Sequence, residues 1–118
     1  MGNVALTEAV YYILLSLTDA LHGYGIMQNV EKLSNGRVKL AAGTLYGAIN
    51  TLLDKGWIKA LDNGADSRKK LYIITNSGMC ALYEEIERLE ELVSNGRRII
   101  KTENKPVEIS LKKPEREV

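Results

Sequence analysis

The sequence contains one cysteine and one histidine among its 118 residues, and this scarcity excludes several classes of protein. Cys80 has no second cysteine to pair with inside the chain, so a disulfide-stabilised secreted domain is excluded. Cys80 and His22 cannot fill the four ligand positions of a structural zinc site, and neither has the partners of a nucleophilic catalytic set. A glycine-rich phosphate-binding loop is also missing. We therefore expect no metal, no cofactor and no enzymatic activity.

A long hydrophobic run is missing as well. The longest apolar stretch extends from Val10 to Leu17 and is interrupted by Ser16, far short of the ~18 residues that a membrane span needs. The start of the chain has no basic segment followed by an apolar one, so a signal peptide is not predicted. With 45% hydrophobic and 26% charged residues, the composition is that of a globular domain. We expect a soluble, cytoplasmic protein with no membrane partner.

The formal net charge of +1 conceals a strong segregation of charge along the chain. Residues 35–75 carry seven basic and three acidic side chains, whereas residues 76–96 carry five acidic and one basic side chain. The flanking segments have net charges of −2 over residues 1–34 and +3 over residues 97–118. A basic middle segment favours contact with nucleic acid, in spite of the near-neutral total.

Hydrophobic residues recur at helical spacing in three short segments of the first half of the chain. We predict helices over residues 7–21, 24–33 and 42–55. Thr7 is the expected N-cap of the first helix, and Gly36 and Gly56 lie where the second and third should end. Three short helices with a tight break before the third are typical of a helix-turn-helix domain.

Two segments rich in aromatic and β-branched residues follow, over residues 57–61 and 68–74, with turn-forming residues between them. They predict a β-hairpin, which is called a wing when it follows a helix-turn-helix. The second strand opens with Arg68-Lys69-Lys70, a triplet that can lie along a phosphate backbone or a minor groove. Alternatively, these cations only protect a solvated hairpin edge from aggregation.

A fourth helix is predicted from about residue 76 to residue 100, because apolar residues there alternate at intervals of three and four. The stripe contains Met79, Leu82, Ile86, Leu89 and Val93, and Tyr83 and Leu92 widen it. One isolated helix cannot bury such a stripe, so we expect a second copy of the chain to cover it. The triplet Ser94-Asn95-Gly96 either ends this helix early or lies inside it.

The predicted fold class is mainly α with a small β-hairpin wing: a winged helix-turn-helix followed by a C-terminal dimerisation helix. Three parts are expected along the chain. They are a DNA-binding domain over residues 1–75, a dimerisation helix over 76–100 and a weakly attached tail over 101–118.

The third predicted helix opens with Gly43-Thr44-Leu45-Tyr46. Hydroxyl groups and free backbone N–H groups at a helix N-terminus suit DNA phosphates, and helix-turn-helix proteins place that end in the major groove. Because Leu45 and Ile49 face the core, Asn50 is left toward solvent, where it can pair with an adenine edge. The alternative interpretation is an N-cap threonine at Thr44 and a packed tyrosine at Tyr46.

Five motifs, in this order and spacing, resemble those of the phenolic acid decarboxylase regulator (PadR) family. They are His22-Gly23-Tyr24, Gly43-Thr44-Leu45-Tyr46, the segment 52–58, the segment 67–72 and Thr75-Asn76-Ser77-Gly78. The resemblance covers about residues 4–100. It implies a bacterial-type transcriptional regulator, usually a repressor, with a winged helix-turn-helix and a single dimerising C-terminal helix.

Applied motif by motif, the resemblance implies that Thr44 and Tyr46 face DNA, with Lys39 and Tyr24 nearby and Lys69 and Lys70 on the wing. Asn50, on the solvent side of the third predicted helix, and Arg68, in the basic triplet of the wing, are added to this set. The candidate DNA-binding residues are thus Tyr24, Lys39, Thr44, Tyr46, Asn50, Arg68, Lys69 and Lys70. Members of the small subfamily that this chain resembles stack flat aromatic ligands on a tryptophan of the last helix. The only tryptophan here is Trp57, so the resemblance does not identify a small-molecule effector.

We therefore predict a homodimeric repressor that binds a double-stranded, pseudo-palindromic DNA operator through its third helix and wing. An unidentified signal, for which a small molecule is one candidate, would release it. The alternatives are a winged-helix module that binds proteins without specific DNA binding, and a small-molecule carrier.

Overall fold

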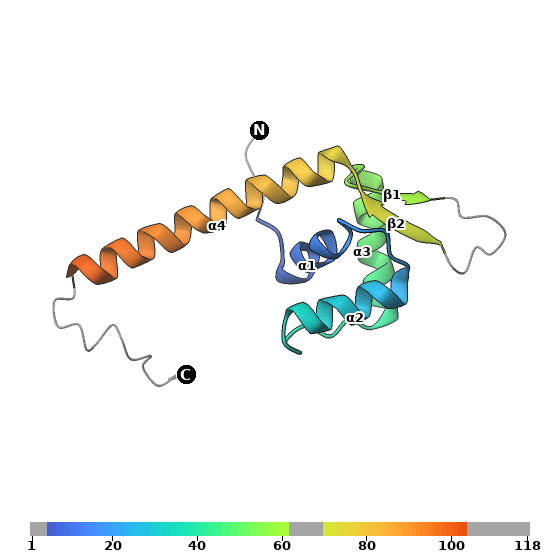
Figure 1. Cartoon of the computed structure of the whole chain (residues 1–118), viewed down its shortest axis with the longest axis horizontal. Coiled ribbons are helices and arrows are strands. Elements are labelled where there is room, and N and C mark those ends of the chain that lie inside the picture. Colours follow the sequence, from blue (N-terminus) through green and yellow to red (C-terminus); the bar gives the residue numbers. More distant parts are fainter. Residues whose placement is uncertain (1–4, 62–69, 104–118) are drawn as a thin grey trace. The chain divides into compact units, whose positions relative to one another are not determined.

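The computed structural model describes residues 5–61 and 70–103, and within these ranges it has four helices and one two-stranded sheet. The elements are α1 (Glu8–Ser16), α2 (Gly23–Leu33), α3 (Ala42–Lys55), β1 (Ile58–Leu61), β2 (Leu71–Ile74) and α4 (Asn76–Glu103). Figure 1 shows the three shorter helices together with the hairpin of β1 and β2. The predicted mainly helical fold with a small β-hairpin is confirmed.

Helix α1 begins where the sequence predicts but ends earlier. Thr7 is its N-cap, and the Thr7 Oγ1 accepts a hydrogen bond of 3.1 Å from the backbone N–H of Val10. This satisfies one of the N–H groups that the first turn of a helix leaves without a partner. The last helical residue is Ser16, whereas the hydrophobic pattern predicts a helix that continues to Leu21.

The residues after α1 form hydrogen bonds to the hairpin instead of continuing the helix. The N–H of Ile74 donates to the carbonyl of Leu17 at 2.8 Å, and Leu21 and Tyr72 exchange backbone hydrogen bonds of 3.1 and 2.9 Å. This antiparallel bridge satisfies backbone groups that would otherwise be left unpaired next to the core. The segment that links α1 to α2 is thereby attached to β2.

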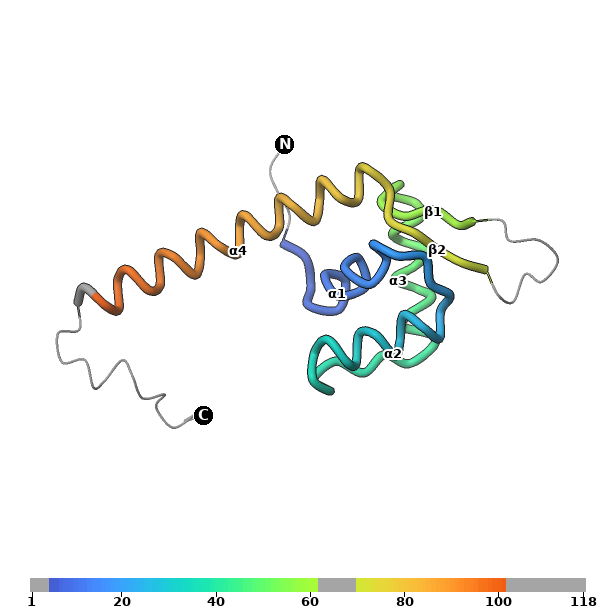
Figure 2. Tube along the Cα trace, viewed as in Figure 1, coloured from blue at the N-terminus to red at the C-terminus, as the bar shows by residue number. Residues whose placement is uncertain are grey.

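Helices α2 and α3 form the helix-turn-helix. At the end of α2, the Oγ of Ser34 accepts a 2.9 Å hydrogen bond from the N–H of Val38 and holds the turn. Gly36 in this turn has a φ of 80°, a left-handed conformation that favours glycine. Helix α3 has the predicted bounds and ends at Gly56, which has a φ of 76°. Figure 2 follows the backbone from α2 through the turn into α3.

Strands β1 and β2 pair antiparallel, from Ile58 opposite Ile74 to Leu61 opposite Leu71. The predicted hairpin is therefore confirmed. The predicted loop and the start of the second predicted strand, including Arg68 and Lys69, lie outside the described residues.

Helix α4 is fixed to the hairpin at its first turn. The Oγ1 of Thr75 accepts a hydrogen bond of 3.1 Å from the N–H of Gly78 and donates one of 2.6 Å to the carbonyl of Gly56. Gly78 is buried, and a Cβ at this position would overlap the carbonyl of Trp57 and lie 2.7 Å from the Cγ1 of Ile74. Only glycine therefore lets α4 start this close to the hairpin.

Helix α4 continues through Ser94-Asn95-Gly96 and ends at Glu103. The chain divides into two compact units, residues 1–85 and residues 86–118. The first unit thus includes the beginning of α4, beyond the predicted domain boundary at residue 75. No helix in the described ranges combines the length and the apolar character that a membrane crossing needs.

The hydrophobic core lies in the first unit and receives side chains from α1, α2, α3, both strands and the start of α4. Its members are Ile13, Leu14, Leu17, Ile26, Val30, Leu45, Ile49, Leu52, Ile58, Tyr72 and Leu82. Fully burying one large apolar side chain contributes about 1.5–3 kcal/mol, so this cluster is the main source of stability. Three of the members come from one face of α3, which leaves the opposite face of α3 to solvent.

Candidate nucleic-acid interface

The solvent side of α3 presents small and polar side chains. Gly43, Thr44, Gly47 and Asn50 are exposed, whereas Leu45 and Ile49 on the other side are fully buried. The N-cap residue Ala41 makes no side-chain cap hydrogen bond to the N–H groups of the first turn. These groups and the hydroxyl of Thr44 can act as donors toward an anion, and Asn50 lies two turns further along the helix.

Two glycines on this face have no role in packing within the described residues. A Cβ built on Gly43 or on Gly47 would meet no atom within 4 Å, and neither residue has a positive φ. A glycine inside a helix is less stable than alanine by about 1 kcal/mol, so the two residues weaken α3 with no visible gain inside the chain. A glycine surface allows a backbone from outside to come close to the helix.

Basic side chains lie on both sides of this face in sequence. Lys39 precedes α3, with 70% of its side chain exposed and its Nζ 4.0 Å from a carboxylate oxygen of Glu31. Lys70, directly before β2, is exposed, and so is Lys59 on β1. Lys59 was not among the sequence-predicted site residues, although the strand alternation around it is a signal that could have found it.

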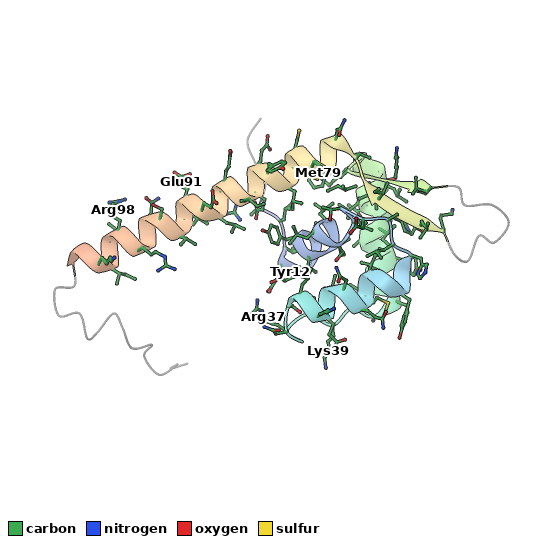
Figure 3. All side chains as sticks on the ribbon, in the orientation of Figure 1. Tyr12, Arg37, Lys39, Met79, Glu91 and Arg98 are labelled. Carbon is green, nitrogen blue, oxygen red and sulfur yellow. The ribbon has the colours of Figure 1, made fainter. Side chains whose placement is uncertain are left out.

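Arg37 differs from Lys39 in its contacts, although only Val38 separates them. Its Nε donates to a carboxylate oxygen of Glu8 at 2.9 Å, which joins the turn before α3 to the first turn of α1. The hydrogen bond and the charge of Glu8 raise the pKa of the Arg37 guanidinium above its usual value. Figure 3 shows Arg37 beside Tyr12 of α1, with Lys39 further along the turn. Arg37 therefore links the turn before α3 to α1 through an exposed ion pair, whereas Lys39 makes only the longer contact with Glu31.

The two predicted tyrosines lie in different surroundings. Tyr24, in the first turn of α2, is 66% exposed, as expected for a contact residue. Tyr46 is 43% exposed, but its hydroxyl end lies against the backbone of Gly23 at the start of α2. Tyr46 also raises the pKa of Tyr72 on β2, after the larger effect of burial. The hydroxyl end of Tyr46 is thus packed, as in the alternative interpretation of this residue.

The predicted dimer-interface residues of α4 fall into three groups by their exposure. Leu82 is only 3% exposed and belongs to the core of its own chain. Met79, Ile86 and Leu89 are half-buried, whereas Tyr83 and Val93 are 61% and 52% exposed. Further along the helix, an apolar surface continues with Leu92, Ile99 and Ile100. Ile99 and Ile100 follow Leu92 and Val93 by seven residues, a spacing visible in the sequence once the helix is known to pass Gly96.

The remaining titratable candidates do not assemble a site. His22 is the N-cap residue of α2 without a side-chain cap, and Cys80 is an exposed free thiol on α4. Within the ranges that the structure describes, no three histidine, cysteine or acidic side chains are grouped to hold a metal ion.

A protein-family model described as the transcriptional regulator PadR-like family matches residues 13–84. The chain belongs to the PadR-like family. The matched residues begin in α1, contain the whole helix-turn-helix and the hairpin, and end in α4 just before Glu85. The family is one of transcriptional regulators, and its match contains the whole of α2, α3, β1 and β2. None of the curated proteins matches this PadR-like chain.

Solved structures with the same architecture support the fold. A transcriptional regulator from Clostridium thermocellum has a TM-score of 0.64 at 22% identity, over 79% of this chain and 89% of that one. A PadR family regulator from Eggerthella lenta has a TM-score of 0.60 at 23% identity, over 77% and 76% of the two chains. F93 from STIV, a winged-helix DNA-binding protein, has a TM-score of 0.59 at 19% identity, over 73% and 88%. The PadR-like chain therefore has a winged-helix fold.

Proposed function

We propose that this PadR-like chain is a repressor that binds double-stranded DNA as a homodimer, with α3 in the major groove and the hairpin along the neighbouring backbone. The observation that carries the proposal is the solvent face of α3. It combines an uncapped N-terminus, two glycines without a packing role and the exposed Thr44 and Asn50, next to Lys39. A helix with these features can approach base edges closely, while its N-terminus and lysine neutralise phosphates.

The apolar surface of the second unit supports the proposed homodimer. Leu92, Val93, Ile99 and Ile100 are each about half exposed on α4, a larger apolar surface than a helix keeps in water alone. A second copy offers the same surface and can cover it through a two-fold axis. Two α3 helices related in this way fit a pseudo-palindromic operator with half-sites about 34–36 Å apart. Because the family is regulatory, the proposal includes no catalytic step and no cofactor, and an unidentified signal ends repression.

Selection of duplexes from a random pool by the purified full chain tests the proposal. We expect an inverted repeat to emerge, with an affinity that falls steeply with salt, since each neutralised phosphate contributes about −0.9 to the logarithmic slope on B-DNA. Lys39→Ala should weaken binding to every duplex and reduce the slope by about 1. Lys101→Ala, which removes an exposed charge from the last turn of α4, is the matched control and should change neither.

The outcomes separate the competing functions. A salt-independent interaction, or no selected sequence at all, would contradict DNA binding and favour a winged helix that binds proteins. Selection of a single half-site by a monomer would retain DNA binding but contradict the homodimer.

A further inference from the structure

Gly23, the first residue of α2, is a glycine for a reason that lies in another helix. A Cβ at this position would overlap the hydroxyl oxygen of Tyr46 and lie 2.7 Å from its Cζ and 3.4 Å from its Cε2. These three nearest atoms all belong to Tyr46. Gly23 has no positive φ, so its backbone conformation is open to any residue. The tyrosine ring is therefore what demands glycine here, and Gly23 is buried beneath it.

The contact between Tyr46 and Gly23 joins α3 to the start of α2, which is itself attached to β2. Tyr46 itself comes from the second turn of α3, and its hydroxyl end reaches the first residue of α2. The residues just before α2 are attached to β2 through the backbone pair of Leu21 and Tyr72. The contact of Tyr46 with Gly23 and the pairing of Leu21 with Tyr72 thus connect α3 to β2 through the start of α2.

We propose that Tyr46 is a positioning residue whose ring, placed in the space that Gly23 leaves, fixes the angle of α3 against α2 and the wing strand. The inference rests on the proposed DNA-binding function and assigns Tyr46 a different role from a direct hydroxyl contact with DNA. The hydroxyl that would bind a phosphate is the atom nearest to Gly23. A fixed angle matters because α3 and the wing must contact one duplex at the same time.

The test uses the full chain and a duplex selected by the wild-type protein, with affinity and the free energy of unfolding measured for each variant. Tyr46→Phe keeps the ring and should bind within about twofold of wild type. Tyr46→Ala and Gly23→Ala should each weaken binding by roughly tenfold, at a temperature at which both variants are folded. Combining Gly23→Ala with Tyr46→Ala should weaken binding no further than Tyr46→Ala alone, because the atoms that an alanine at position 23 meets are gone.

A matched control separates positioning from mere loss of stability. Ile13→Val removes one methyl from the fully buried core in α1 and should lower the free energy of unfolding by about 0.5–1.5 kcal/mol. The DNA affinity of the folded Ile13→Val protein should equal that of wild type. An affinity loss in this variant as large as that of Tyr46→Ala would overturn the proposal.

Other outcomes also decide the matter. Equal losses in Tyr46→Phe and Tyr46→Ala would assign the effect to a direct hydroxyl contact and overturn the positioning role. Additive losses in the double variant would show that Gly23 is required for a reason other than Tyr46. If Gly23→Ala does not fold, the comparison of Tyr46→Phe with Tyr46→Ala still decides between the positioning role and a direct hydroxyl contact. A wild-type chain that selects no duplex contradicts the proposed function before any substitution is made, so the two failures are distinguishable.

Discussion

Single residues in this chain show two different uses of glycine. At Gly23 and Gly78 a neighbouring group fills the space that a side chain would need, and the requirement lies inside the fold. At Gly43 and Gly47 that space is open, so no group in the described residues explains the missing side chain. The first kind of glycine serves packing. The second kind weakens a helix without a gain in packing, which agrees with the proposed approach of DNA to this face.

Gly47→Ala should therefore move stability and DNA affinity in opposite directions. The free energy of unfolding should rise by up to ~1 kcal/mol, because alanine has the better helix propensity and its Cβ meets no atom. Affinity for the selected duplex should fall by roughly tenfold, because the added methyl keeps α3 away from the groove. Urea unfolding and a DNA titration measure the two effects. Ser94→Ala, at an exposed site in α4, is the control: it should also raise the free energy of unfolding but leave DNA affinity unchanged. A Gly47→Ala protein that binds DNA like wild type would show that this face of α3 is not part of the interface.

Tyr72 is the residue whose ionisation we expect to affect stability. Burial, and then Tyr46, raise the pKa of its hydroxyl in the folded chain. A raised pKa means that the folded state favours the neutral form, so this contribution is complete below the unfolded value of about 10 and is lost as pH rises above it. The free energy of unfolding should fall as the pH rises above about 10, and less so in Tyr72→Phe. Tyr83→Phe, at a position that is 61% exposed, is the control and should show the wild-type dependence of stability on pH. A dependence in Tyr72→Phe as steep as that of wild type would contradict the assignment of the effect to Tyr72.

At the scale of elements, the sequence predicts boundaries well where one residue determines them. Thr7 caps α1 and Gly56 ends α3, as local chemistry requires. The early end of α1 was not predictable in this way, because the hydrogen bonds that end it come from β2, far away in the chain. Ser94-Asn95-Gly96 stayed ambiguous for the opposite reason: three residues of low helix propensity do not outweigh a long continuous helix.

The candidate site was predictable to a similar degree. Helical periodicity identified the exposed face of α3, including Thr44 and Asn50, because exposure follows from which residues face the core. It could not place the hydroxyl end of Tyr46, since a long side chain can reach a neighbouring helix that the pattern of one helix does not describe. Periodicity likewise could not distinguish Leu82, which is buried in its own chain, from Val93, which is exposed on the same stripe.

The two lysines at the start of the second predicted wing strand test the proposed contact of the wing with DNA phosphates. Lys69→Ala combined with Lys70→Ala should weaken binding to all duplexes by a similar factor, because phosphate contacts carry no sequence information. The logarithmic salt slope should become shallower by about 2, measured by titration at several salt concentrations. Arg97→Ala combined with Lys101→Ala removes the same charge from exposed positions of α4 and should leave the slope as it is. A loss confined to one sequence would mean that the wing contacts bases instead.

At the scale of the whole molecule, the near-neutral charge conceals two neighbouring segments of opposite charge. The segment 35–75, which contains α3 and the wing, is basic, whereas the segment 76–96 is acidic and contains most of the apolar stripe. An acidic helix repels DNA, so the apolar stripe beside these carboxylates suits a protein partner better than a duplex. A dimer formed through α4 would present two basic regions to one duplex and double the number of phosphate contacts.

Val93→Glu tests this arrangement at a position that the core of the single chain does not use. Val93 is 52% exposed, so the substitution should leave the free energy of unfolding of one chain nearly unchanged while placing a charge in the proposed dimer interface. We expect sedimentation to report monomers for Val93→Glu and dimers for wild type at micromolar concentration. Ser94→Glu adds the same charge to the neighbouring exposed position, about 100° around the helix, and should remain dimeric. Because a monomer contacts one half-site only, Val93→Glu should also lose the preference for the inverted repeat over a single half-site. A dimeric Val93→Glu protein would place the interface elsewhere, and a Ser94→Glu monomer would mean that any added acid on this acidic helix prevents association.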